Sequence, residues 1–208
     1  MASIKPARKN SKQSGKSTGK NAQSARAGQV RIIAGKYRGR KLPVLDAQGL
    51  RPTTDRVKET VFNWLMPYVA ESVCLDSCAG SGSLGFEALS RGAKQVVFVE
   101  LEKLAAKNIK ENIQRLQDNQ SEVLCQSIFA FNPTKLFDLV FIDPPFNQGL
   151  ASQIADHLEQ QNLLADDAIL YVETEQQFDT DKLPKNWQLL KEKSAGQVVS
   201  RLYQRQPD

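Results

Sequence analysis

The sequence is poor in the residues that build disulfide and metal scaffolds, with three cysteines and one histidine among 208 residues. Two of the cysteines, Cys74 and Cys78, lie in or beside an expected strand, which favours reduced thiols over a disulfide framework. No second cysteine pair accompanies them. The lone histidine, His157, lies in a polar helical pattern and is expected on the surface, so we expect no metal site.

Long apolar runs are also missing. No stretch of the sequence is apolar over the length that a bilayer-spanning helix needs. The basic N-terminus lacks the apolar segment of a secretory signal. We therefore expect a cytoplasmic protein with no membrane association.

Acidic residues are absent from the first 45 positions, which hold 12 lysines and arginines. Such asymmetry indicates a polyanion partner, because each basic side chain that meets a phosphate releases condensed counterions. A solvated tail that only keeps the protein soluble is the alternative. Residues 1–29 contain one isoleucine and no aromatic residue, so this segment cannot bury enough apolar surface to order itself and is expected to be disordered.

The length fits one globular domain with a tail, and 40% hydrophobic residues suffice for an ordinary core. We expect a disordered basic tail over 1–29, a hairpin and helix extension over 30–70, and an α/β domain over 71–208. Nothing in the sequence requires more than a monomer.

Five of the 12 basic residues in the first 45 positions lie in the extension. Short strand-like segments on either side of Gly35 and Gly39 predict a hairpin. Basic side chains interleaved with an aromatic suit RNA, where cations meet phosphates and an exposed base can stack. The hairpin residues expected to bind RNA are Arg31, Lys36, Tyr37, Arg38, Arg40 and Lys41.

A helix is expected after Pro52, because Val57, Val61, Trp64, Leu65 and Tyr68 recur at helical spacing. This apolar stripe should pack on the main sheet. The start of the helix carries an unusually polar cluster, which we expect near the mouth of a ligand site. The cluster consists of Arg51, Thr53, Asp55 and Arg56.

Residues 72–100 read as strand, glycine turn, helix and second strand. Gly80, Gly82 and Gly85 have the spacing of a dinucleotide fingerprint, and the second strand ends in Glu100. Open α/β sheets bind ligands at the carboxyl ends of their strands. Glycines let the backbone approach a ligand, the helix N-terminus favours anions, and a strand-end carboxylate accepts hydrogen bonds from ribose hydroxyls.

This pattern alone does not choose a cofactor, since NAD and S-adenosylmethionine both carry an adenosine ribose. Asp76, just ahead of the turn, favours S-adenosylmethionine, because a carboxylate there can meet a cationic amino-acid end that NAD lacks. A glycine turn that only packs helix on strand is the alternative.

The tetrapeptide Asp143-Pro144-Pro145-Phe146 follows an apolar strand over 137–142. An exocyclic base amine shares its lone pair with the ring and is a poor nucleophile. Hydrogen bonds from its N–H groups to the Asp143 carboxylate and the Pro144 carbonyl would localise that pair, while Phe146 offers a ring for an extruded base. Proline stiffens the turn. Positioning and electrostatic stabilisation then suffice for catalysis of methyl transfer, without a metal or a covalent nucleophile. The alternative is that Asp-Pro-Pro is an ordinary rigid turn.

The remaining pattern alternates helices with strands, which indicates a mostly parallel sheet. The last two strands, linked at Gly196, predict an antiparallel edge. The further helices are expected at 101–116 and 150–161, and the further strands at 122–126, 168–173, 187–191 and 197–203.

Four runs of this sequence resemble the RsmD family. They are RIIAGKYRGRKLP (31–43), GLRPTTDRVKETVFNWL (49–65), DSCAGSGSLGFEALSRGA (76–93) and DPPF (143–146). The resemblance covers the chain from about Val30 to the C-terminus. The last run alone is shared with enzymes that act on adenine N6 and cytosine N4, whereas the first two are much more specific.

The RsmD family comprises bacterial S-adenosylmethionine-dependent methyltransferases that modify the N2 amine of a guanine in 16S ribosomal RNA. The resemblance implies a class I methyltransferase domain over 71–208, which is α/β and Rossmann-like, with a mostly parallel seven-stranded sheet, an antiparallel edge strand and the N-terminal extension. It also implies a target of the guanine-966 type, in the small ribosomal subunit or its assembly intermediate.

Residue roles follow from the same resemblance. The implied S-adenosyl-L-methionine site is Asp76, Ala79, Gly80, Ser81, Gly82, Gly85, Glu100, Ser127 and Thr53. The implied catalytic residues are Asp143, Pro144, Pro145 and Phe146, and Arg51 and Arg56 join the hairpin residues as expected RNA-binding residues.

Two positions depart from the family's usual pattern. Cys78 stands where relatives usually have an aromatic residue. Ser127 stands where many methyltransferases place an acid against the adenine amino group, although a serine hydroxyl can also accept that hydrogen bond. Two other functions fit part of the pattern: an adenine-N6 methyltransferase acting on DNA or RNA, and a non-catalytic RNA-binding assembly factor.

Overall fold

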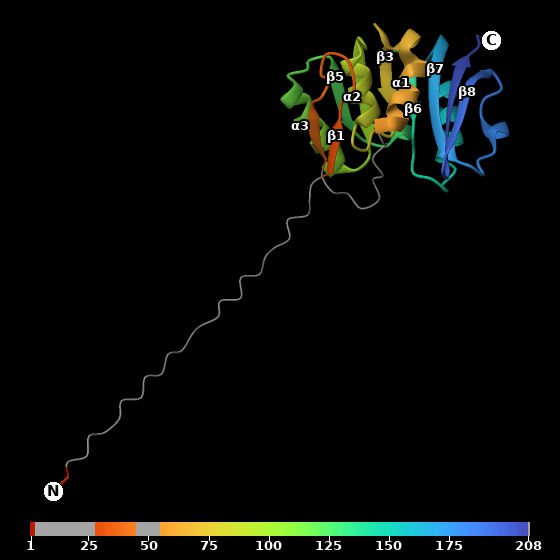
Figure 1. Ribbon diagram of the computed structural model, residues 1–208. Coiled ribbons are helices and arrows are strands. Elements are labelled where there is room, and N and C mark those ends of the chain that lie inside the picture. Colours follow the sequence, from red (N-terminus) through yellow and green to blue (C-terminus); the bar gives the residue numbers. More distant parts are fainter. Residues whose placement is uncertain (3–27, 45–54, 208) are drawn as a thin grey trace.

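The computed structural model describes residues 1–2, 28–44 and 55–207. Within these residues, one sheet of seven strands forms the body of the molecule, in the order β5-β4-β3-β6-β7-β9-β8 (Figure 1). Its strands are β3 (Val73–Asp76), β4 (Gln95–Glu100), β5 (Ser121–Cys125), β6 (Phe137–Ile142), β7 (Leu164–Glu175), β8 (Trp187–Ala195) and β9 (Val198–Arg205). The helices are α1 (Asp55–Val69), α2 (Ser83–Ser90), α3 (Lys103–Leu116) and α4 (Leu150–Gln160), with short 3-10 turns η1 (Ile128–Ala130) and η2 (Thr180–Lys182).

The strands β3 to β7 pair in parallel, as the alternation of helices and strands predicts. β9 is antiparallel to both of its neighbours. The sheet therefore ends in an antiparallel pair, as the sequence predicts. The turn at Gly196, with φ at +63°, brings β9 back between β7 and β8, and β8 forms the edge.

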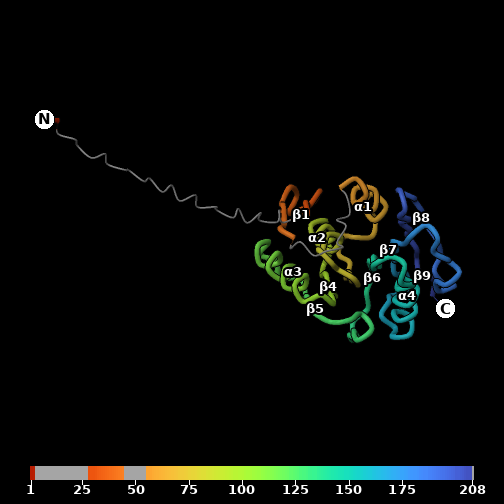
Figure 2. The backbone as a smooth tube through the Cα atoms, turned by 90° about the horizontal axis from the view of Figure 1, so that it is seen from below, coloured from red at the N-terminus to blue at the C-terminus, as the bar shows by residue number. Residues whose placement is uncertain are grey.

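Helices cover both faces of the sheet, and Figure 2 shows α4 on the opposite side from α1 and α2. Successive strand residues point to opposite faces. Cys74 and Phe98 therefore pack in the core beneath α1, α2 and α3. Leu75 and Val97 pack in a second core with α4 and η1.

Two further strands, β1 (Gly28–Arg31) and β2 (Lys41–Val44), form the expected antiparallel hairpin. Its apolar residues Ile32 and Leu42 belong to the same core as α1 and α2. β1 begins inside the segment expected to be a disordered tail. Residues 3–27 of that segment lie outside the described residues, as do Arg51 and Thr53.

The helix expected after Pro52 is α1, and its buried side chains include Val61 and Leu65. Val57, Trp64 and Tyr68 of the expected stripe pack against the core while remaining partly exposed. None of the helices that the structure describes is both long enough and apolar enough to cross a membrane.

Candidate active site

The glycine turn is fastened to the end of the neighbouring strand. The Gly80 backbone N–H donates to Oε2 of Glu100 at 2.6 Å, and the Ala79 N–H donates to the carbonyl of Val99 at 3.0 Å. Gly80 and Gly82 have φ values of +53° and +74°, in the left-handed region that favours glycine. The strand-end acid thus shapes the turn.

Asp76 is buried at the end of β3, with 2% of its surface exposed. Its Oδ2 accepts a hydrogen bond from the backbone N–H of Gly85 at 3.0 Å. Burial raises the pKa of Asp76 to about 7, and the nearby charge of Glu100 acts in the same direction. Two carboxyl groups therefore lie beside the glycine turn, as the sequence predicts.

Gly85 has a packing role that the fingerprint also requires. A Cβ added at Gly85 would lie 2.2 Å from Cε1 of Phe98 on β4, which is far inside van der Waals contact. The glycine lets α2 lie directly on the strand. Packing of helix on strand, the alternative reading of the turn, is therefore one of its functions, and a contact from Gly85 to a cofactor stays a prediction.

The N-terminus of α2 opens toward the same region. Its N-cap residue, Gly82, has no side chain with which to bond the first helical N–H groups. The neighbouring Ser83 hydroxyl is buried and, among the described residues, has no hydrogen-bond partner. Buried polar groups without partners are uncommon in native proteins and call for an explanation.

The strand that precedes the tetrapeptide Asp143-Pro144-Pro145-Phe146 lies next to β3. Phe141 on β6 pairs with Asp76, and the Ser77 hydroxyl donates to the Phe141 carbonyl at 2.7 Å. Asp143 follows two residues later at the same edge. Burial raises the pKa of Asp143 well above its usual range, and the charges of Glu173 and Asp76 add to the effect.

A small hollow opens beside the tetrapeptide. Pro144 is buried, Pro145 is exposed and Phe146 is half-buried. The hollow is lined by these three residues together with Gly149, Leu150, Ala151, Glu173, Thr174, Glu175 and Phe178. Phe146 therefore lines this hollow together with Pro144, the residue that follows Asp143.

Comparison with known proteins agrees with this geometry. A family model described as conserved hypothetical protein 95 matches residues 30–204. The ribosomal RNA small subunit methyltransferase D of Haemophilus influenzae is 56% identical over 186 residues, which cover 85% of this chain and 94% of that relative. This chain belongs to the RsmD family.

Two further relatives support membership of the RsmD family. The Escherichia coli K12 protein of the same name is 46% identical over 182 residues, covering 86% of this chain and 92% of that relative. The solved structure of the Escherichia coli protein yhhF, provisionally assigned as a methyltransferase, gives a TM-score of 0.81 at 45% identity and covers 87% of this chain and 100% of its own. The class I methyltransferase fold is confirmed.

The positions where this chain departs from the usual RsmD pattern have ordinary local roles. Burial raises the pKa of the Cys78 thiol to about 12, so this thiol stays neutral in the turn. The Ser127 hydroxyl caps η1 by accepting from the Phe129 N–H at 3.3 Å. Whether Ser127 also contacts adenine stays a prediction.

His157, which the sequence places on the surface, is half-buried. Its Nε2 lies 3.3 Å from the carbonyl oxygen of Phe131, and its ring meets that of Phe129 edge-on at 5.6 Å between centroids. The sequence does not predict this contact, because the residues next to His157 are polar and its partners Phe129 and Phe131 are distant in the chain.

The basic hairpin presents its charges to solvent but not its aromatic residue. The exposed basic side chains are Arg31, Lys36, Arg38, Arg40, Lys41 and, at the start of α1, Arg56. Tyr37 is only 7% exposed and belongs to the core. The expectation that Tyr37 stacks on a base is therefore corrected, because its ring is packed on the protein and Lys36 Nζ lies 4.9 Å from its centroid.

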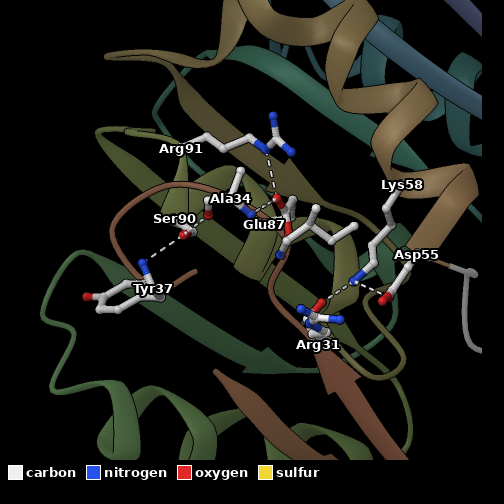
Figure 3. Close-up of polar contacts among 9 residues, drawn as sticks. Arg31, Ala34, Tyr37, Asp55, Lys58, Glu87, Ser90 and Arg91 are labelled. Atoms are coloured by element: carbon white, nitrogen blue, oxygen red, sulfur yellow. Dashed lines mark hydrogen bonds and ion pairs between the residues drawn. The ribbon is translucent and has the colours of Figure 1, made fainter. Parts of the chain in front are cut away.

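The hairpin is docked on α2 through a set of buried polar contacts (Figure 3). The Glu87 carboxylate accepts from the N–H groups of Ile33 and Ala34 at 2.8 and 3.1 Å. The Ser90 hydroxyl accepts from the Tyr37 N–H at 2.9 Å. On α1, Lys58 Nζ donates to the Arg31 carbonyl at 2.5 Å.

This docking separates part of the basic surface from the sheet edge that carries Asp76, Glu100 and Asp143. α2 begins at the glycine turn, and Glu87 and Ser90 lie in its last turns, at the other end of the helix. Lys36, whose N–H donates to the Ser90 carbonyl at 2.7 Å, lies at that far end. The structure thus brings Asp76, Glu100 and Asp143 together. The tip of the hairpin lies at the opposite end of α2 from these three carboxyl groups.

Proposed function

We propose that this chain transfers a methyl group from S-adenosyl-L-methionine to the exocyclic N2 amine of a specific guanine in 16S ribosomal RNA. The observation that carries the proposal is the position of Asp143, which follows β6 beside the glycine turn and immediately precedes Pro144, one of the residues that line a hollow with Phe146. Membership of the RsmD family supports it.

The residues around the turn fit S-adenosylmethionine, which supplies a methyl group already activated as a sulfonium. Glu100 offers a strand-end carboxylate whose oxygens keep lone pairs for ribose hydroxyls after accepting from Gly80 and Glu102. Asp76 offers a buried negative charge for the cationic amino-acid end. The Ser83 hydroxyl at the start of α2, which has no hydrogen-bond partner among the described residues, is a further group that a polar cofactor would satisfy.

At the base, Asp143 and the Pro144 carbonyl accept hydrogen bonds from the two N–H groups of the amine. This concentrates the nitrogen lone pair on the side that meets the methyl carbon. S-adenosylmethionine would supply the methyl group, whose bond to sulfur would break as its bond to nitrogen forms, and the Asp143 carboxylate or water would take the proton released from nitrogen. Positioning and electrostatic stabilisation of this kind account for large rate effects without a covalent intermediate.

The choice of ribosomal RNA rests on the names of the relatives, which are small-subunit ribosomal RNA methyltransferases. We propose the same substrate here, with a target of the guanine-966 type, in the small subunit or its assembly intermediate. The exposed basic hairpin supports an RNA partner. We expect the protein to act as a cytoplasmic monomer.

Asp143→Ala tests the catalytic assignment. We expect methyl transfer to fall by at least about 10²-fold, since the acceptor for the amine is removed, while binding of S-adenosylmethionine and RNA stays largely unchanged. Asp156→Ala, an exposed carboxylate on α4, is the matched control and should leave turnover as it is. Unchanged turnover in Asp143→Ala would show that this carboxylate does not act on the amine.

A further inference from the structure

Glu173 lies beside Asp143 on the same face of the sheet. β6 and β7 are parallel neighbours, in which Phe141 pairs with Tyr171 and Ile142 with Val172. The next residues along the chain are Asp143, just past the end of β6, and Glu173 on β7, and the charge of Glu173 is close enough to raise the pKa of Asp143. The rings of Phe141 and Tyr171 meet at 6.3 Å between centroids, and side chains two residues further along a strand point to the same face.

The Glu173 carboxyl is held in place. It is 8% exposed and its Oε2 accepts a hydrogen bond from the Tyr171 hydroxyl at 2.6 Å. The same hydroxyl lies 3.0 Å from Oγ of Ser200 on β9, which fixes it in turn. Glu173 also lines the hollow that Pro144 and Phe146 border.

A second buried carboxyl at this place has no part in the transfer described above. Desolvating an ionisable group is costly unless a partner meets it, and one carboxylate suffices to orient an amine. Burial also raises the pKa of Glu173, and the bond from Tyr171 opposes that rise. The group is therefore placed to meet a hydrogen-bond donor on whatever fills the hollow.

Guanine supplies such a donor next to its reactive amine. Its N1 carries a hydrogen adjacent to the N2 amine, so two neighbouring carboxylates can accept from N1–H and N2–H together. Adenine presents an unprotonated N1 beside its amine, and a carboxylate facing that lone pair finds no hydrogen. A site built to bond a polar group discriminates strongly against an analogue that lacks it, because its own polar group is left unpaired.

We propose that Glu173 is the residue that selects guanine, by accepting a hydrogen bond from N1–H while Asp143 accepts from the N2 amine. This rests on the proposed function. It explains how Asp-Pro-Pro-Phe, which also suits adenine N6 and cytosine N4, can serve guanine here.

The test compares guanine with 2-aminopurine, placed in synthetic RNA at the nucleotide that the wild type methylates. Both bases carry a 2-amine, but N1 of 2-aminopurine has no hydrogen. We expect the kcat/KM of the wild type to be roughly 10²-fold lower with 2-aminopurine than with guanine. In Glu173→Gln the amide can donate to the bare N1, so the ratio between the two bases should shrink to within about tenfold.

Ser200→Ala is the matched control, because it changes the second contact of Tyr171 while leaving the Tyr171–Glu173 bond available. Ser200→Ala should change the kcat/KM for guanine and for 2-aminopurine by the same factor. If Glu173→Gln fails to fold, Tyr171→Phe, which removes the bond that orients Glu173, should also shrink the ratio. The absent O6 of 2-aminopurine affects every variant alike, so the change in ratio reports on N1.

The outcomes separate the two proposals. N2-methylguanosine made by the wild type, with a ratio that Glu173→Gln leaves unchanged, would overturn the role of Glu173 and leave the proposed function standing. No methyl transfer to guanine by the wild type would overturn both.

Discussion

The carboxylate of Glu87 on α2 accepts a hydrogen bond from the backbone N–H of Ile33 at 2.8 Å, across 54 positions of sequence. Glu87 is fully buried and also pairs with Arg91, whose Nε lies 2.7 Å from Oε1. The helix that starts at the glycine turn therefore ends at the basic hairpin. The N-terminal extension is part of the methyltransferase core rather than an appendage to it.

Removing this carboxylate should destabilise the protein strongly. Glu87→Ala leaves the half-buried Arg91 and the N–H groups of Ile33 and Ala34 without their acceptor. We expect the free energy of unfolding to fall by about 3–5 kcal/mol, as when one partner of a buried ion pair is removed. Urea denaturation measures it.

Glu111→Ala is the control, because Glu111 is an exposed partner of Lys107 at 3.9 Å. Its cost should stay within about 0.5 kcal/mol. Equal destabilisation in the two variants would mean that the hairpin is not held by Glu87.

The approach of the hairpin loop to α2 depends on a glycine. A Cβ at Gly35, where φ is +79°, would lie 1.7 Å from the carbonyl oxygen of Ser90. At Gly39, where φ is +80°, a Cβ has nothing within 4 Å. Gly39→Ala should therefore lower the free energy of unfolding by about 1–2 kcal/mol, the penalty for a Cβ at a left-handed φ. Gly35→Ala should lower it by clearly more. Thermal and urea unfolding of the two variants compare them, and equal costs would refute the close contact.

Asp76 should make stability depend on pH. Its pKa is raised to about 7 from an ordinary 3.8, so between these values the native state holds a proton that the unfolded state has released. The free energy of unfolding contributed by Asp76 then falls as the pH rises through this window and is constant above it. Asp76→Asn lacks this dependence and keeps an acceptor for the Gly85 N–H.

As the pH rises from 4 to 8, we expect the free energy of unfolding of Asp76→Asn to increase relative to that of the wild type by on the order of 4 kcal/mol. Urea denaturation across that range gives the difference. Asp143 and Glu173 titrate in both proteins, so their effects largely cancel. A difference that does not vary with pH would contradict the raised pKa.

The basic N-terminal segment should contribute to RNA affinity by binding phosphates. Residues 1–27 hold seven lysines and arginines, and deleting them leaves β1 intact. We expect RNA affinity to fall and the slope of log K against log salt to decrease in magnitude by roughly 0.7–0.9 for each phosphate that the shortened protein no longer neutralises. Titrations at several salt concentrations measure the slope. The same slope with and without the segment would show that it does not touch phosphate.

The sequence predicts the strands and the turn at the Asp143 edge of the sheet well, because each of these parts carries a local signal. β6 is found at its expected bounds, since an unbroken apolar run stops at Asp143 and Pro144. β3 and the glycine turn are equally well marked. β7 begins four residues before the expected Ala168, because the polar pair Asp166 and Asp167 interrupts its pattern.

The sequence does not reveal contacts whose partners are distant or are backbone atoms. Glu87 stands as a single acid in an otherwise apolar and uncharged helix, which is a usable sign of a buried pair, but the N–H groups that it binds leave no trace in the sequence. Tyr37 looked exposed because its neighbours are basic. The sequence marks Glu173 only as the end of a strand, and the pairing of β7 with β6 places it beside Asp143.

Transfer of labelled methyl from S-adenosylmethionine to unmodified 16S RNA, offered naked and as assembled small subunits, tests the proposed reaction most directly. The RNA is digested to nucleosides and separated by chromatography. We predict label in N2-methylguanosine, and the better substrate shows what the basic surface recognises. Label in N6-methyladenosine would contradict the assigned base, and no label in either nucleoside would contradict the assigned reaction and favour a non-catalytic RNA-binding factor.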